Sequence, residues 1–82
     1  MRRRVKFINS FSFEGGFGFG WVNILHDEED NILVYSGGEN LDNTLEGRGI
    51  NRSSFEIELK VKDFSIYRGM KQTRIKVKSI LN

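Results

Sequence analysis

The chain has no cysteine and no proline, and no hydrophobic run in it is long enough to cross a membrane. Without cysteine there is no disulfide, no thiolate metal site and no thiol nucleophile. Crossing a bilayer takes about 20 consecutive apolar residues, and no hydrophobic stretch follows the three N-terminal arginines to make a secretory signal. We therefore expect a soluble, cytoplasmic protein stabilised by its core alone.

Patterns typical of catalysis or metal binding are also missing. The single histidine, His26, has no cysteine to pair with and no evident nucleophile. The acids of residues 27–30 are consecutive, so in a tight turn they point apart, and EF-hand spacing is absent. The 82 residues predict one domain, 1–82, too small for a deep enzyme cleft. We expect no enzyme, no cofactor and no metal site.

Charge is segregated along the chain, although the net charge is only +2. Residues 1–13 carry four bases, residues 14–47 carry eight acids and no Lys or Arg, and residues 48–82 carry nine bases and three acids. Such segregation indicates distinct charged faces, and a basic face favours a polyanionic partner. We expect residues 1–4, with their three arginines, to form a mobile basic arm, which either adds nonspecific phosphate contacts or is inert.

Alternating hydrophobicity predicts five strands. The first runs from about Val5 to Phe13 with a bulge near residues 8–10, and the others cover about 17–25, 32–35, 55–62 and 72–80. Residues 36–51 are rich in Gly, Asn and acids, which predicts a loop with at most one helical turn near 41–45. A three-stranded meander, an irregular connection and a second hairpin favour an all-β, five-stranded oligonucleotide-binding (OB) barrel with little or no helix. An SH3-like barrel is the alternative.

Two segments resemble a small OB-fold domain found in phage and mobile-element proteins. These are FEGGFGFGWVNILHDEEDN and, later, VKDFSIYRGMKQTRIKV. The residues that match the family pattern are Phe13, Glu14, Gly15, Phe17, Gly18, Trp21, Asn31, Tyr67, Arg68, Gly69, Lys71, Gln72 and Thr73. The resemblance implies an OB fold and single-stranded DNA binding, often within a larger protein. Residues 36–51 depart from the pattern, because they are more glycine-rich and acidic than the family's connection.

Cations beside aromatic rings form the candidate nucleic-acid site. A single strand is bound by positive charge along its phosphates and by flat rings against its bases. In an OB fold the loop between the fourth and fifth strands is one of two that contact oligonucleotides. The candidate residues are Tyr67, Arg68, Lys71, Arg74, Lys76, Lys60, Lys62, Trp21 and Phe19. The lysines can equally protect a sheet edge from pairing.

The rings of Phe17, Phe19 and Trp21 alternate with glycines and allow two interpretations. They can stack on bases, at about 1–3 kcal/mol each, or fill the barrel while the glycines let it curve. A small barrel needs large core residues, so the core interpretation is favoured for Phe17 and Phe19. Trp21 fits both interpretations equally.

These features predict a protein that binds single-stranded nucleic acid, DNA in the first place, with low sequence specificity. The alternative is a protein-interaction module or small phage-type inhibitor that docks on a host, replication or nuclease protein through its acidic segment. The candidate contacts for that alternative are Asp27, Glu28, Glu29, Asp30, Glu39, Asp42 and Glu46.

Overall fold

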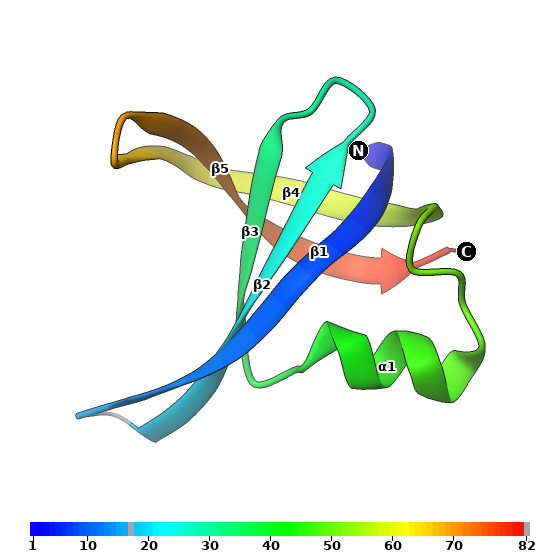
Figure 1. Ribbon diagram of the computed structural model, residues 1–82, viewed down its shortest axis with the longest axis horizontal. Helices are drawn as coiled ribbons and strands as arrows, with labels where there is room; N and C mark the ends of the chain where they lie inside the picture. Colours follow the sequence, from blue (N-terminus) through cyan, green and yellow to red (C-terminus); the bar gives the residue numbers. More distant parts are fainter. Residues whose placement is uncertain (17, 82) are drawn as a thin grey trace.

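A computed structural model describes residues 1–16 and 18–81, and for Tyr67 the backbone alone. The elements in chain order are β1 (Arg2–Gly15), β2 (Gly18–Asp27), β3 (Ile32–Gly37), α1 (Leu41–Arg48), β4 (Phe55–Tyr67) and β5 (Met70–Ile80). Their arrangement is shown in Figure 1.

The five strands close into a barrel in the order β1-β2-β3-β5-β4. β1 pairs antiparallel with β2 and with β4, and β3 joins the two hairpins through a parallel pairing with β5. The closed five-stranded all-β barrel confirms the OB-like architecture that the sequence predicts. The meander, the irregular connection and the second hairpin all occur in the predicted order.

The core sits between the two hairpins and α1. β4 contributes the alternating residues Phe55, Ile57 and Leu59, and β5 contributes Ile75, all nearly inaccessible to solvent. The predicted bulge in β1 is confirmed, because the β1–β2 register shifts between Phe7 and Asn9. The buried hydrophobic residues are Val5, Leu25, Leu33, Leu41, Leu45, Ile50, Phe55, Ile57, Leu59, Ile75 and Ile80.

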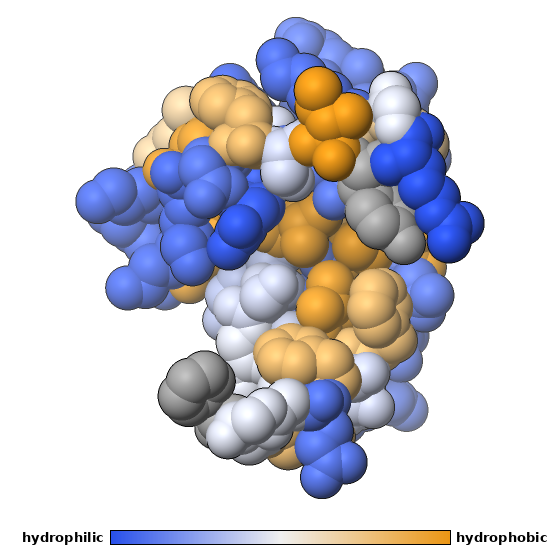
Figure 2. All heavy atoms as spheres, turned by 90° about the vertical axis from the view of Figure 1, so that its left-hand side faces the viewer, coloured by the Kyte–Doolittle hydropathy of each residue, from blue (hydrophilic) through white to orange (hydrophobic). Residues whose placement is uncertain are grey.

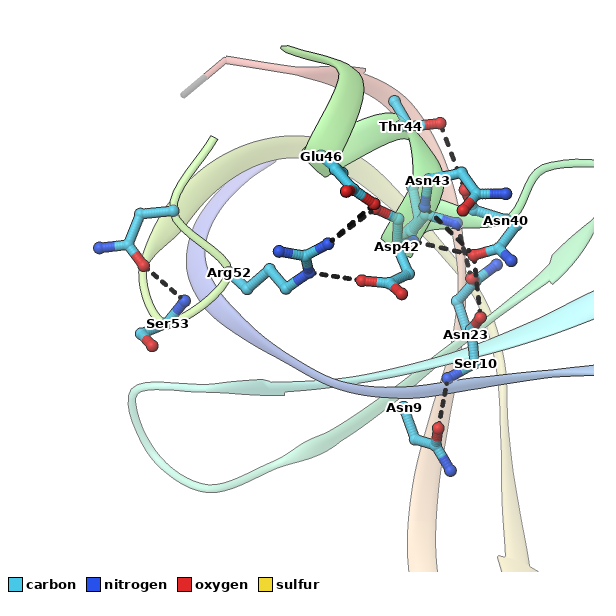
Figure 3. A network of polar contacts seen from close by, with 12 residues as sticks. Asn9, Ser10, Asn23, Asn40, Asp42, Asn43, Thr44, Glu46, Arg52 and Ser53 are labelled. Atoms are coloured by element: carbon cyan, nitrogen blue, oxygen red, sulfur yellow. Dashed lines mark hydrogen bonds and ion pairs between the residues drawn. The ribbon is translucent and has the colours of Figure 1, made fainter. Parts of the chain in front are cut away.

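The connection after β3 holds a longer helix than the one turn that the sequence predicts. α1 has eight residues and is capped at both ends. At its start, Asn40 Oδ1 accepts hydrogen bonds from the backbone N–H groups of Asp42 and Asn43 (Figure 3). At its end, Gly49 has φ 66°, the left-handed conformation that glycine adopts at helix C-caps. The two caps stabilise a helix that the glycine-rich, acidic composition of residues 36–51 does not predict.

A buried asparagine holds α1 against the barrel. Asn23, in β2, is completely inaccessible to solvent. Its Nδ2 donates to the backbone carbonyls of Tyr35 (3.2 Å) and Glu39 (2.9 Å), and its Oδ1 accepts from the Leu41 N–H (2.9 Å). Asn23 therefore uses both of its amide hydrogens. Its Oδ1 fixes where the helix begins, beside Asn40 in Figure 3.

The predicted mobile arm at residues 1–4 is wrong. Arg2, Arg3 and Arg4 lie in β1 and pair with Glu58, Ile57 and Glu56 of β4. The Arg2 guanidinium also lies 3.8 Å from a Glu56 carboxylate oxygen and 3.9 Å from one of Glu58. These residues close the barrel, because their backbone groups complete the β1–β4 ladder.

Candidate nucleic-acid interface

Two hairpin ends extend away from the barrel on one side (Figure 1). We call them the β1–β2 arm (residues 11–16 and 18–21) and the β4–β5 arm (residues 63–74). Figure 2 looks onto this side, where a hollow separates an upper lobe from a lower one and hydrophobic side chains gather between hydrophilic ones. In an OB-like barrel these arms carry the loops after the first and fourth strands, which are the loops that contact oligonucleotides.

The β4–β5 arm ends in a two-residue turn. Tyr67 pairs with Met70, and the two residues between them have positive φ angles, 51° at Arg68 and 78° at Gly69. Two successive positive φ values are typical of the type I′ turn, whose twist matches that of the flanking strands. The turn places Arg68 at the exposed tip. The predicted stacking role of Tyr67 concerns a side chain outside what the structure describes.

A cation and an aromatic ring meet on this arm. Lys71 Nζ lies 5.1 Å from the centroid of the Phe64 ring, within the range of a cation–π contact. Phe64 is 63% exposed, so most of its ring remains accessible to a ligand. The sequence analysis names Lys71 as a contact but not Phe64, although the alternation that places Lys60 and Lys62 outward gives Phe64 the same parity.

Three of the predicted lysines come together at the base of the arm. Lys60 and Lys76 are cross-strand partners, and all three of Lys60, Lys62 and Lys76 are exposed. Lys62 and Lys76 also line one shallow groove. Like charges placed directly opposite each other destabilise a sheet, so a bound anion would relieve this pair.

Arg74, the remaining predicted cation, already has a partner. Its Nε lies 3.4 Å from Asp63 Oδ1 across the β4–β5 ladder. Half of each side chain is exposed, so the guanidinium can still face a phosphate, although the carboxylate offsets its charge.

The β1–β2 arm supplies two of the predicted rings. Phe19 is 65% exposed, which shows that its core interpretation is wrong. Trp21 is half-buried, and its ring meets that of Phe19 edge to face at a centroid distance of 5.5 Å. The core interpretation of Phe17 concerns a residue outside the described ranges. Phe19 lies beyond the part of β2 that pairs with β3, so no third strand covers it.

Two further aromatic residues on this arm are exposed but are not among the candidates from the sequence. Phe11 and Phe13 are exposed, because the bulge between Phe7 and Asn9 moves the alternation onto the outer face. The Phe13 ring lies over Gly20, where an added Cβ would come within 2.6 Å of Phe13 Cζ. Gly20 therefore leaves room for the ring on the surface of the sheet.

The acidic residues that are candidate protein contacts lie in two separate places on the barrel. The stretch Asp27–Asp30 lies at the β2–β3 turn, at the top of Figure 1, whereas α1 lies at the bottom. Glu39 accepts hydrogen bonds from the hydroxyls of Tyr35 and Thr44. Arg52 bridges the other two acids, forming ion pairs with Asp42 and, at 3.6 Å, with Glu46 (Figure 3).

Asp27 organises the β2–β3 turn. Its carboxylate accepts hydrogen bonds from the backbone N–H groups of Glu29 and Asn31 and from the Asn31 side chain. Partial burial alone would raise the pKa of Asp27, but these hydrogen bonds and the nearby Arg3 together hold the pKa below its ordinary value. In the acidic cluster near α1, burial and then the adjacent Glu39 raise the pKa of Tyr35. Asp27 and Glu39 thus both form hydrogen bonds that stabilise the fold.

Within residues 1–16 and 18–81, no group of three or more histidine or acidic side chains is placed to hold a metal ion. The same part of the chain contains no helix of the length and hydrophobicity needed to span a membrane. No protein-family model, curated protein or solved structure matches the chain. The geometry of the two arms is therefore the basis for a functional proposal.

Proposed function

We propose that this protein binds single-stranded nucleic acid, DNA in the first place, with low sequence specificity. The observation that supports it best is the combination of exposed rings and cations on the two arms of an OB-like barrel. Phe19 and Trp21 stand on one arm, and Phe64 with Lys71 on the other. Rings accept any base by stacking, and lysines follow the phosphates without reading sequence.

The path of the strand follows from the charges. Bases stack on the exposed rings of the arms, and the phosphates lie along Lys60, Lys62 and Lys76. The carboxylates of Asp42 and Glu46 are held by Arg52 near α1, away from this side of the barrel. In a duplex the bases are paired and stacked on one another, so aromatic side chains cannot stack on them. The exposed aromatic rings therefore favour binding of the single strand.

The test is a titration of the protein with a labelled oligo-dT of about 20 nucleotides, longer than the roughly 4–16 nucleotides that one OB fold covers. A duplex of the same length is the control, and the emission of Trp21, the only tryptophan, is followed in parallel. We expect preference for the single strand and quenching of Trp21. No binding to oligo-dT at about 50 mM salt, where phosphate contacts are strong, would rule the proposal out.

A further inference from the structure

The barrel is closed at one end and open at the other. At the lower end in Figure 1, α1 inserts the fully buried side chains of Leu41 and Leu45 into the core. At the upper end the start of β1, the β2–β3 turn and the β4–β5 arm surround a cavity of about 300 Å³. We call this cavity the barrel mouth. None of the candidate contacts in the acidic cluster near α1 lies there.

The barrel mouth has an apolar floor. Leu33, Leu59 and Ile75 line it, and each is also part of the hydrophobic core. Val61, half-buried on β4, completes the floor, and Phe64 forms part of its wall. Such a floor suits the face of a planar heterocycle, because small-molecule sites combine apolar walls with a few polar groups that fix orientation.

The rim of the mouth carries those polar groups. Arg3 and Lys71 line it from β1 and β5, and Thr73 adds a hydroxyl. Among the described lining side chains these two cations outnumber one carboxylate, that of Asp27, which is already occupied by hydrogen bonds within its turn. The rim is thus suited to an anionic group attached to the heterocycle on the floor.

We infer that the barrel mouth holds one unpaired nucleotide, its base on the apolar floor beside Phe64 and its phosphate at Arg3 and Lys71. The inference rests on the proposed function, because that nucleotide belongs to the strand bound along the arms. A volume of about 300 Å³ is at the lower end of the range for ligand pockets. The barrel mouth is large enough for one unstacked base but too small for a base pair. This size limit adds to the preference for single strands.

The test uses the full chain with isotope-labelled methyl groups and thymidine monophosphate as the probe. We expect saturable shifts at the methyls of Leu33, Leu59 and Val61, while those of Leu41 and Leu45, at the α1 end, stay in place. Thymidine and inorganic phosphate, titrated separately, should each bind more weakly than the monophosphate. Unmoved floor methyls, or inorganic phosphate shifts that equal those of the monophosphate, would overturn the inference.

A pair of neighbouring arginines provides matched variants. Arg3→Gln should weaken binding of the monophosphate about tenfold, the loss expected for one charge-assisted hydrogen bond. Arg4→Gln removes the same charge from a residue that does not line the mouth and donates to Ser54, so binding should stay within about twofold. Equal losses in the two variants would show a general charge effect and contradict the site.

A parallel titration with oligo-dT separates this inference from the proposed function. Floor methyls that shift with oligo-dT as they do with the monophosphate support both. If oligo-dT binds while the floor methyls stay unmoved with either probe, the proposed function stands and the mouth is not a nucleotide site. If oligo-dT fails to bind, the proposed function fails, and the monophosphate titration still decides whether the mouth takes a nucleotide.

Discussion

At the scale of single residues, the buried polar groups of this protein are those that organise its backbone. Asn23 sits in the core yet satisfies two carbonyls and one N–H. Among the described residues, no buried side-chain nitrogen or oxygen lacks a hydrogen-bond partner. Alternation could place Asn23 on the inner face, but only the tertiary structure shows what it binds.

Replacing Asn23 by alanine should lower the free energy of unfolding by about 1–3 kcal/mol, because buried backbone groups lose their partner. Urea denaturation at unchanged m-value measures the loss. Asn43→Ala, exposed on α1, is the matched control and should change stability by less than about 0.5 kcal/mol. An Asn23→Ala protein as stable as the control would show that the network contributes nothing.

The pKa of Asp27 predicts a stability that depends on pH. Because the folded pKa lies below the ordinary value of 3.8, ionised Asp27 stabilises the fold above that value, and the contribution is lost as pH falls through the folded pKa. We expect the Tm of the wild type to fall as the pH is lowered through this range. In the Asp27→Asn variant the Tm should depend less on pH. Asp30→Asn, at an exposed site in the same turn, should leave the pH dependence of Tm unchanged. An equal reduction of the pH dependence in both variants would contradict this role of Asp27.

At the scale of elements, α1 shows how capping offsets a poor composition. Its last turn contains Gly47, and only two of its side chains, Leu41 and Leu45, are buried. Asn40 accepts from two backbone N–H groups and also from the Ser10 hydroxyl at 3.0 Å. Asn40 therefore stabilises the first turn of the helix and also connects it to β1.

Asn40→Ala should cost about 0.5–2 kcal/mol of stability, the range measured for N-cap substitutions. Asn40→Ser keeps a capping oxygen and should recover most of the loss. Urea denaturation compares the three proteins. A serine variant as unstable as the alanine variant would indicate that packing, and not the cap, is responsible.

The arms are the elements on which the proposed function depends. Phe19→Ala and Phe64→Ala should each weaken oligo-dT binding by about 1–3 kcal/mol, since each removes a stacking surface. Leu81→Ala removes another exposed apolar side chain, after β5 and outside both arms, and should bind as the wild type does. Fluorescence titration measures all three, and full affinity in both Phe variants would contradict stacking on the arms.

At the scale of the whole molecule, folding places the basic and the acidic side chains in different regions of the barrel. The lysines of β4 and β5 gather beside the arms, whereas the acids of residues 27–46 are divided between the β2–β3 turn and the region of α1. A small net charge of +2 thus coexists with a local basic surface. Local charge of this kind drives binding to nucleic acid through the release of counterions.

Binding should therefore weaken with salt. A strand that contacts about three to five cations gives a slope of roughly −2 to −3.5 in a plot of log K against log salt concentration, at about −0.7 per contact. The double variant Lys60→Gln with Lys76→Gln should reduce the slope by about 1.4. Lys78→Gln, farther along β5, is the control. An unchanged slope in the double variant would place the phosphates elsewhere.

Alternating residues by themselves determined the strands, the β1 bulge and the closing hairpin, because in-out periodicity is a local property of the chain. Four cations of β4 and β5 were equally predictable, since strand parity alone exposes Lys60, Lys62, Arg74 and Lys76. The contacts of Asn23 with Leu41 and of Asn40 with Ser10 were not predictable, because the partners lie far apart in the sequence.

Tertiary structure decided the remaining features. Arg2–Arg4 became a strand because β4 offers them a free edge. Phe19 remained exposed because its end of β2 extends past the pairing with β3, and Phe64 because its end of β4 extends past the pairing with β1. The barrel mouth exists because α1 fills one end of the barrel while its other end, formed by residues from β1, β3, β4 and β5, stays open. Each of these depends on which strand lies beside which, and hydrophobic periodicity does not contain that information.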